Sequence, residues 1–115
     1  MTVKERWLAA LRSGDYKQGK DSLKTEANTF CCLGVLCDVV KDDLGAYWSE
    51  VEPGAWRKSF MVDGVYYNTE YPPYEVNELI PTLTMGQRST LIRMNDTAGS
   101  VNTFAVIADY IEENL

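Results

Sequence analysis

Residues 30–40, FCCLGVLCDVV, form the most apolar stretch of the 115-residue chain. The run lacks the strict alternation of apolar and polar positions that a half-buried strand shows. Eleven such residues suit a buried helix better than a strand, although the valines and cysteines keep a strand open as the alternative. Lys41 and the two aspartates after it make the chain polar again. We therefore expect a buried helix here.

The sequence before this stretch predicts a second helix over about residues 3–13. Thr2 is a suitable N-cap, and Ser13-Gly14 supplies a stop signal. The apolar stripe of this helix consists of Trp7, Leu8 and Leu11. Residues 14–29 are mostly polar and contain two glycines, so we predict a loop there.

Residues 56–68, WRKSFMVDGVYYN, predict a β-hairpin. Asp63-Gly64 separates two β-rich runs, Ser59–Val62 and Val65–Asn68. Asp-Gly favours the two-residue type I′ turn, whose twist matches that of paired strands.

Two further helices are predicted towards the C-terminus. Thr84 and Gln87 have capping-box spacing, so one helix should run from there to about residue 94. The last helix should begin at Ser100 or Asn102, and Phe104, Ile107, Ala108 and Ile111 make its apolar face. These elements indicate a single, mainly helical α+β domain, residues 1–115, with one hairpin.

The charge is unevenly distributed. Residues 1–24 hold six basic and three acidic groups, whereas the remainder holds five basic and fourteen acidic groups, and the formal net charge is −6. A net negative charge argues against a general nucleic-acid-binding role. A basic segment on an acidic domain indicates either an anionic ligand near the N-terminus or a solvated basic surface.

The basic segment 12–20, RSGDYKQGK, contains the chemistry that a nucleotide-like ligand needs. Its cations suit phosphate groups, its tyrosine offers a stacking face, and its glutamine both donates and accepts. The predicted ligand-binding residues are Arg12, Tyr16, Lys17, Gln18 and Lys20, with Arg88 and Arg93 contributing from the penultimate helix. A solvated basic loop and helix-surface charges are the alternatives. The segment is not a Walker loop, because Asp21 follows Lys20.

The chain contains no histidine, which removes the commonest general base and metal ligand. The cysteines, Cys31, Cys32 and Cys37, lack the spacing of paired C-x2-C knuckles and a fourth ligand. We interpret them as reduced, buried thiols, with a zinc site or a nucleophile as the alternatives. We expect no cofactor, no metal and no catalytic residue.

Asp38 follows the apolar run and, if buried, needs partners, for which the basic residues of the first segment are candidates. An enzyme would need two carboxylates in one cleft, and Asp38 and Asp96 are the pair to consider. No apolar run reaches the roughly 18 residues of a membrane span. The N-terminus is too charged for a signal peptide, so a cytoplasmic location is expected.

Several motifs resemble a family of small proteins encoded by tailed phages and prophages: W-x2-ALRSG-x-YKQGK from Trp7, FCCLGVLCD from Phe30, LIRMND from Leu91 and F-x2-IADYIEENL from Phe104. The resemblance implies expression inside an infected bacterial cell and transfers no catalytic residues. Small phage proteins of this kind often act against host defences, so it implies an anti-defence role.

The leading hypothesis is a non-enzymatic protein that sequesters a small, anionic, nucleotide-like host immune signal. The alternative is an inhibitor or DNA mimic that blocks a host defence protein through its acidic surface. That surface would use Glu50, Glu52, Glu70, Glu75, Glu78, Glu112 and Glu113. We also expect a homo-oligomer, because ligand pockets often form between subunits.

Overall fold

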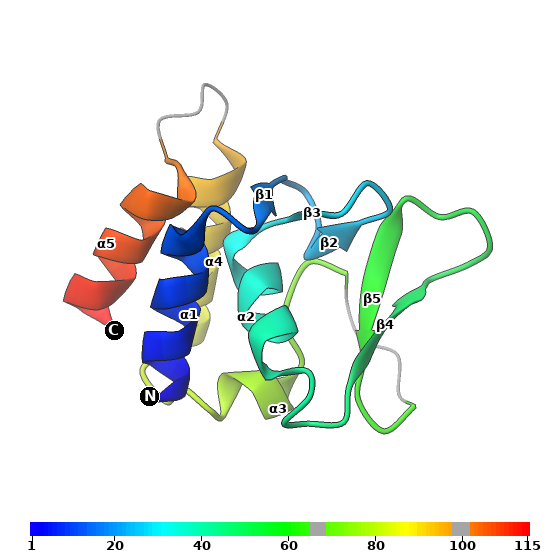
Figure 1. Cartoon of the computed structure of the whole chain (residues 1–115), viewed down its shortest axis with the longest axis horizontal. Helices are drawn as coiled ribbons and strands as arrows, with labels where there is room; N and C mark the ends of the chain where they lie inside the picture. The colour runs from blue at the N-terminus through cyan, green and yellow to red at the C-terminus, as the bar shows by residue number, and fades with distance from the viewer. Residues whose placement is uncertain (65–68, 98–101) are drawn as a thin grey trace.

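Helices gather on one side of the molecule and a mixed sheet lies on the other (Figure 1). The computed structural model describes residues 1–64, 69–97 and 102–115. Within these residues the helices are α1 (Val3–Ser13), α2 (Cys32–Val40), α3 (Tyr74–Asn77), α4 (Met85–Asp96) and α5 (Phe104–Asn114). The predicted α+β class, mainly helical, is confirmed. None of the helices in the described part of the chain has the length and apolarity that a membrane crossing requires.

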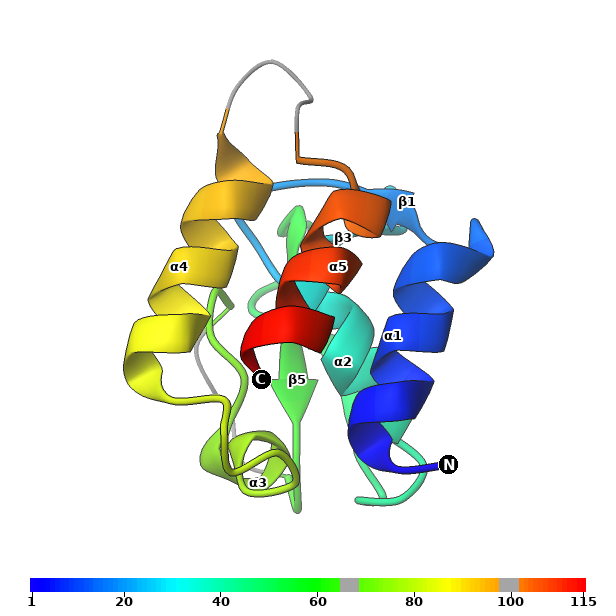
Figure 2. The same cartoon turned by 90° about the vertical axis from the view of Figure 1, so that its left-hand side faces the viewer.

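Helix α2 is the centre of the core, with α1 and α4 packed against it, and α5 packs against α1 and α4 (Figure 2). Residues 32–37 and Val40 are all buried, because this helix is apolar on almost every side. The buried helix predicted over residues 30–40 is therefore confirmed. It begins at Cys32, with Cys31 as N-cap, because Phe30 pairs in a strand.

Gly34 allows the chain before α2 to lie directly against the helix. A Cβ atom at this position would collide with the carbonyl oxygen of Leu23. Leu23 is itself fully buried, and its carbonyl accepts a hydrogen bond from Cys31 N at 3.2 Å. The close approach thus positions residues 14–29 relative to the core.

Helix α1 forms as predicted. Thr2 and Glu5 make a complete capping box, and Gly14 ends the helix with a φ of 81°. The indole Nε1 of Trp7 donates to the Cys32 carbonyl at 2.9 Å, so the one polar atom of a fully buried tryptophan is satisfied.

Residues 14–29, predicted as a loop, contain the strands β1 (Lys17–Gln18) and β2 (Lys24–Thr25) and the first residue of β3 (Thr29–Phe30). Strand β1 pairs in parallel with β3, and β2 is antiparallel to β3 and to β5. The loop prediction was wrong for these residues, because two-residue strands are too short to show a period of two.

The sheet order is β1-β3-β2-β5-β4, with β4 at Tyr47–Glu50 and β5 at Arg57–Met61. The first strand of the predicted hairpin corresponds to β5, and Asp63 and Gly64 after it have φ values of 53° and 73°, as a type I′ turn requires. The second predicted strand, 65–68, lies outside the described residues. The sequence did not reveal the antiparallel pairing of β5 with β4.

Helix α4 begins at the predicted N-cap, where Thr84 accepts a hydrogen bond from Gln87 N, but it continues to Asp96. Helix α5 is capped by Thr103, so the predicted start at Asn102 was one residue early, and Ser100 lies outside the described residues. The two additional residues of α4 place its C-terminal end beside β1, which also contacts the beginning of α5.

Candidate functional site

The side-chain amide of Asn95 connects three parts of the chain. Its Oδ1 accepts hydrogen bonds from Cys32 N at 3.2 Å and from Gln18 Nε2 at 3.1 Å. Its Nδ2 donates to the Gly19 carbonyl at 2.8 Å and to Asp96 Oδ1 at 3.1 Å. Asn95 is only 5% exposed, and all four hydrogen-bonding positions of its amide are occupied.

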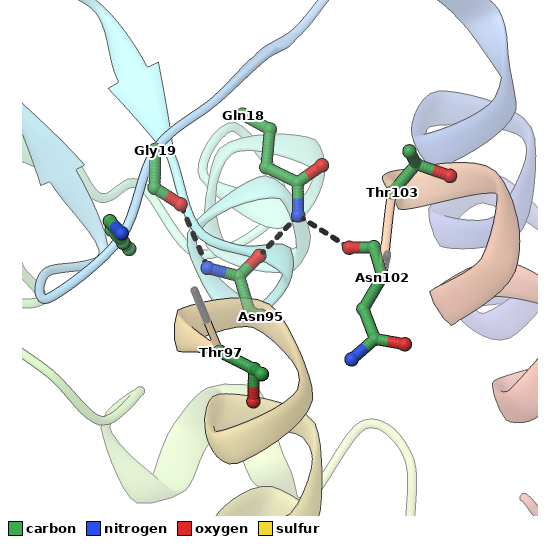
Figure 3. A pocket seen from close by; sticks show the side chains of 7 residues that line it. Gln18, Gly19, Asn95, Thr97, Asn102 and Thr103 are labelled. Atoms are coloured by element: carbon green, nitrogen blue, oxygen red, sulfur yellow. Dashed lines mark hydrogen bonds between the residues drawn. The ribbon is translucent and has the colours of Figure 1, made fainter. Parts of the chain in front are cut away.

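Gln18 extends this network to α5. Its Nε2 also donates to the Asn102 carbonyl at 2.9 Å (Figure 3). Its Oε1 accepts from Phe104 N at 3.1 Å. The Phe104 N–H belongs to the first turn of α5, where the helix itself offers no acceptor. Gln18 therefore holds the beginning of α5 against β1.

A pocket of about 250 Å³ opens beside these amides, between β1, the end of α4 and the beginning of α5 (Figure 3). Its lining is Gln18, Gly19, Lys20, Asn95, Thr97, Asn102 and Thr103. These residues supply three carboxamides, two hydroxyls and one ammonium group, and no carboxylate. Because the protein as a whole carries a net negative charge, a lining without carboxylates repels an anion less than the rest of the surface does.

Two sources of positive potential adjoin the pocket. Lys20 is exposed and, among the residues that the structure describes, has no salt-bridge partner. The N-terminus of the eleven-residue helix α5 also faces this region, with Thr103 as its cap. The partial positive charge of a helix N-terminus favours negative groups nearby.

The structure brings only two of the predicted binding residues, Gln18 and Lys20, to this pocket. Arg12 instead pairs with Asp109 at 2.8 Å and Glu112 at 3.4 Å, which fixes α1 to α5. Lys17 is exposed on β1 outside the pocket lining.

Arg88 and Arg93 do not line the pocket either. Arg88 is in the first turn of α4, and its Nη1 donates to the Leu83 carbonyl at 2.7 Å. Arg93 is exposed in the last turn of the same helix. The sequence indicated that these arginines share a helix but not that the pocket lies past its C-terminal end.

Tyr16 belongs to a second polar network, centred on Asp38. Asp38 accepts hydrogen bonds from the Tyr16 hydroxyl at 2.6 Å, Trp48 Nε1 at 2.9 Å and Lys41 Nζ at 2.9 Å. Burial raises the pKa of this carboxyl, but the three donors outweigh burial and leave it lowered overall. Burial and the bond to Asp38 raise the pKa of Tyr16. The hydrogen-bond partner that the first segment supplies to Asp38 is thus a tyrosine, whereas Lys24 of the same segment acts on Asp38 only through its charge.

Asp38 and Asp96 lie at opposite ends of α2. Asp38 is in its last turn, whereas Asp96 accepts from Asp21 N at 3.2 Å and adjoins Asn95, which bonds the first residue of the helix. The six residues from Cys32 to Asp38 span about 9 Å of helix at 1.5 Å per residue. The two carboxylates therefore do not share a cleft.

The three cysteine thiols are at most 3% exposed. Burial raises the pKa of Cys31 to about 12 and also raises that of the other two, so the thiols are protonated. Packing in the core is confirmed for all three. In the described ranges no group of three His, Cys, Asp or Glu residues is arranged to hold a metal ion.

Sequence reasoning missed Asn95, Thr97, Asn102 and Thr103 as lining residues. The predicted helix end at about residue 94 leaves Asn95 outside the helix, because Asn-Asp followed by Thr resembles a helix stop. The available signal for these lining residues was the polar sequence on both sides of the connection between α4 and α5. The end of one helix and the beginning of the next are close in space when the connection between them is short.

No curated protein and no solved structure matches the chain. One family model covers residues 1–115, and its description is a domain of unknown function, DUF8296. It assigns no enzymatic activity. A match over the whole length shows that the chain belongs to the DUF8296 family.

Proposed function

We propose that this protein binds and sequesters a small anionic, nucleotide-like ligand in the pocket between β1, α4 and α5, without chemical turnover. The observation that carries the proposal is the lining of amides, hydroxyls and Lys20, with no carboxylate, on a chain of net charge −6. An anionic group placed there meets a cation, a helix N-terminus and neutral hydrogen-bonding groups.

The size of the pocket limits which part of a ligand it encloses. Its volume of about 250 Å³ is at the low end for small-molecule sites, which are roughly 300–1,000 Å³. A phosphate with its sugar, or one base, would fit, and the rest of a larger nucleotide would extend over the surface. The phage resemblance makes a nucleotide signal of the infected cell the first ligand class to test.

The groups that remain for a ligand are those not used inside the protein. Gln18 and Asn95 are occupied by contacts within the chain and act as a scaffold. Lys20 and the side chain of Asn102 are in position to contact a ligand. The Thr103 hydroxyl accepts from Val106 N as the cap of α5, but its O–H can still donate to a ligand. A carboxylate pair that would support hydrolysis is absent from this lining, so the ligand should leave unchanged.

Native mass spectrometry and calorimetry against cyclic dinucleotides, cyclic trinucleotides and ADP-ribose derivatives test the proposal. We expect one compound to bind and to be released at unchanged mass. Lys20→Ala should weaken binding at least about tenfold, because a charge-assisted contact is lost. The native spectra also show whether the protein is a homo-oligomer.

Lys17→Ala is the matched control, because it removes an equal charge three residues away and outside the lining. Arg12→Ala should also retain binding, since its guanidinium is engaged by Asp109 and Glu112. If no compound binds, or if the Lys17 and Lys20 variants lose affinity equally, the proposed site is wrong.

A further inference from the structure

A second hollow lies at the other end of the molecule, where β4 and β5 are joined. It has a volume of about 370 Å³ and is lined by Val51, Glu52, Ala55, Trp56, Arg57 and Thr69. The β4–β5 pair lies at the edge away from α4 and α5 (Figure 1). No residue of this hollow lines the pocket beside Asn95.

The backbone around the hollow is held by hydrogen bonds. Ala55 N donates to the Glu52 carbonyl at 3.0 Å, and the Trp56 carbonyl accepts from Glu26 N at 2.8 Å. The carbonyl of Thr69 accepts from Leu23 N at 2.7 Å. The lining residues are therefore anchored to β2 and to the core, and the position of the Trp56 backbone is fixed.

The side chain of Trp56 is oriented by Arg57. Trp56 is 46% exposed, and the guanidinium carbon of Arg57 lies 4.6 Å from the centre of its ring. An exposed indole that is already held in place loses little entropy on binding, so it is a suitable platform for a second flat ring.

Arg57 has hydrogen-bonding capacity that the chain does not fill. Its Nε is buried and has no hydrogen-bond partner among the described residues. Its Nη1 is 3.8 Å from Glu70 Oε1, beyond hydrogen-bond distance. A ligand cannot reach the buried Nε, but the Arg57 side chain is 40% exposed, so its terminal N–H groups can donate to a carbonyl on a ligand.

The charges around the hollow favour a neutral ligand. Glu52 lines it, and Glu70 faces Arg57 from outside the lining, so two carboxylates accompany one guanidinium. A phosphate would be repelled here, in contrast to the pocket beside Asn95. A carboxylate such as that of Glu52 accepts hydrogen bonds, so it suits ring N–H or amino donors.

We propose that the hollow beside Trp56 binds a neutral planar heterocycle that carries both a carbonyl acceptor and N–H donors, the chemistry of a nucleobase such as guanine. The ring stacks on Trp56, its carbonyl accepts from Arg57, and its N–H edge donates to Glu52. This site is independent of the function proposed above.

Titration with guanosine tests the site, with calorimetry and tryptophan fluorescence as readouts. The two other tryptophans are shielded, since Trp7 is fully buried and Trp48 is half-buried, so quenching should come from Trp56. We expect guanosine to bind and to quench. 1-Methylguanosine, which lacks the N1–H donor, should bind at least about tenfold more weakly.

Trp56→Ala should abolish binding of guanosine, and Glu52→Ala and Arg57→Ala should each weaken it about tenfold. Tyr47→Ala is the matched control, because Tyr47 is an exposed aromatic residue of β4 outside the lining. Trp56→Phe, which keeps a ring, should retain weak binding without the quenching. Circular dichroism checks that each variant is folded.

Failure of guanosine to bind the wild-type protein, or equal affinity for Trp56→Ala, overturns the proposal. Equal affinity for 1-methylguanosine overturns the role of Glu52. Lys20→Ala should leave guanosine binding unchanged, and Trp56→Ala should leave binding of an anionic ligand beside Asn95 unchanged. The proposals for the two sites can therefore be disproved independently of each other.

Discussion

The two ends of α2 are held by networks of the same design but different chemistry. At the N-terminal end the neutral amide of Asn95 bonds Cys32 N and takes Gln18 as a partner from β1. At the C-terminal end the carboxylate of Asp38, only 15% exposed, takes Tyr16 as a partner from the residues just before β1. One short segment thus helps to fix both ends of the central helix.

The difference shows what each network contributes. An amide both donates and accepts, so Asn95 satisfies carbonyls and N–H groups together and does not titrate in the ordinary pH range. A carboxylate only accepts, so Asp38 gathers three donors and its contribution depends on pH. The Asn95 network includes one carboxylate, that of Asp96, but Asp96 does not line the candidate ligand pocket.

Asn95→Ala should have the largest effect, because it removes the amide at the centre of the network at the N-terminal end of α2. It leaves the buried Cys32 N–H, the Gly19 carbonyl and the Gln18 amide without their partner. Since each unsatisfied buried group costs about 1–3 kcal/mol, the free energy of unfolding should fall by about 3 kcal/mol or more. Urea unfolding followed by circular dichroism measures it.

Asn114→Ala is the control for this prediction. Asn114 is exposed at the end of α5 and its amide makes one hydrogen bond, to the Tyr110 carbonyl. Its loss should cost less than about 0.5 kcal/mol, as for most surface substitutions. A loss below about 1 kcal/mol for Asn95→Ala would contradict the central role of that amide.

Asp38→Ala should have the next largest effect, about 2–3 kcal/mol, because it leaves the Trp48 indole and the Tyr16 hydroxyl without an acceptor. Asp38→Asn keeps one acceptor oxygen and should cost less than the alanine variant. The same urea series measures both. If the asparagine variant is as damaging as alanine, the negative charge, and not the acceptor, holds this end of α2.

The elements with a strong periodic or capping signal could be predicted from the sequence. The apolar residues 30–40 and the Thr2 and Thr84 caps identified α2, α1 and α4. The strands β1, β2 and β3 could not be predicted, because they exist through pairing between distant residues. Lys24, for example, pairs with Lys58 of β5.

The candidate site could be predicted only in part. Gln18 and Lys20 belong to a segment whose composition indicates ligand binding, and both line the pocket. Asn95, Asn102 and Thr103 became visible only when α4, α5 and β1 met in space. Arg12 had the right chemistry for phosphate, but Asp109 and Glu112, about 100 residues away, occupy it.

Lowering the pH should affect the two networks differently. The lowered pKa of Asp38 means that its contribution is complete above the unfolded value of 3.8 and is lost as the pH falls through the lower folded value. The stability difference between wild type and Asp38→Asn should therefore shrink as the pH falls below 3.8. Three of the four hydrogen bonds of Asn95 go to groups that do not titrate, so most of the cost of Asn95→Ala should persist over the same range. A decline as large as that of Asp38→Asn would contradict the view that the Asn95 network is held mainly by uncharged groups.

Tyr16→Phe should have the smallest effect, about 1 kcal/mol, because it removes one of the three donors to Asp38 and leaves the ring against Phe30. The raised pKa of Tyr16 means that its hydroxyl stabilises the fold below the unfolded value of 10.0 and that this is lost as the pH rises through the folded value. Above pH 10 the wild type should therefore lose stability relative to Tyr16→Phe. In acid the order reverses: the variant has one donor fewer on Asp38, so its acid unfolding should begin at a higher pH than that of the wild type. Urea unfolding of the wild type and of Tyr16→Phe at pH 3, 7 and 10.5 measures the stability difference in acid, near neutrality and in base. A constant difference at every pH would mean that Tyr16 acts through packing alone and that the Asp38 network is not what makes this end of α2 sensitive to pH.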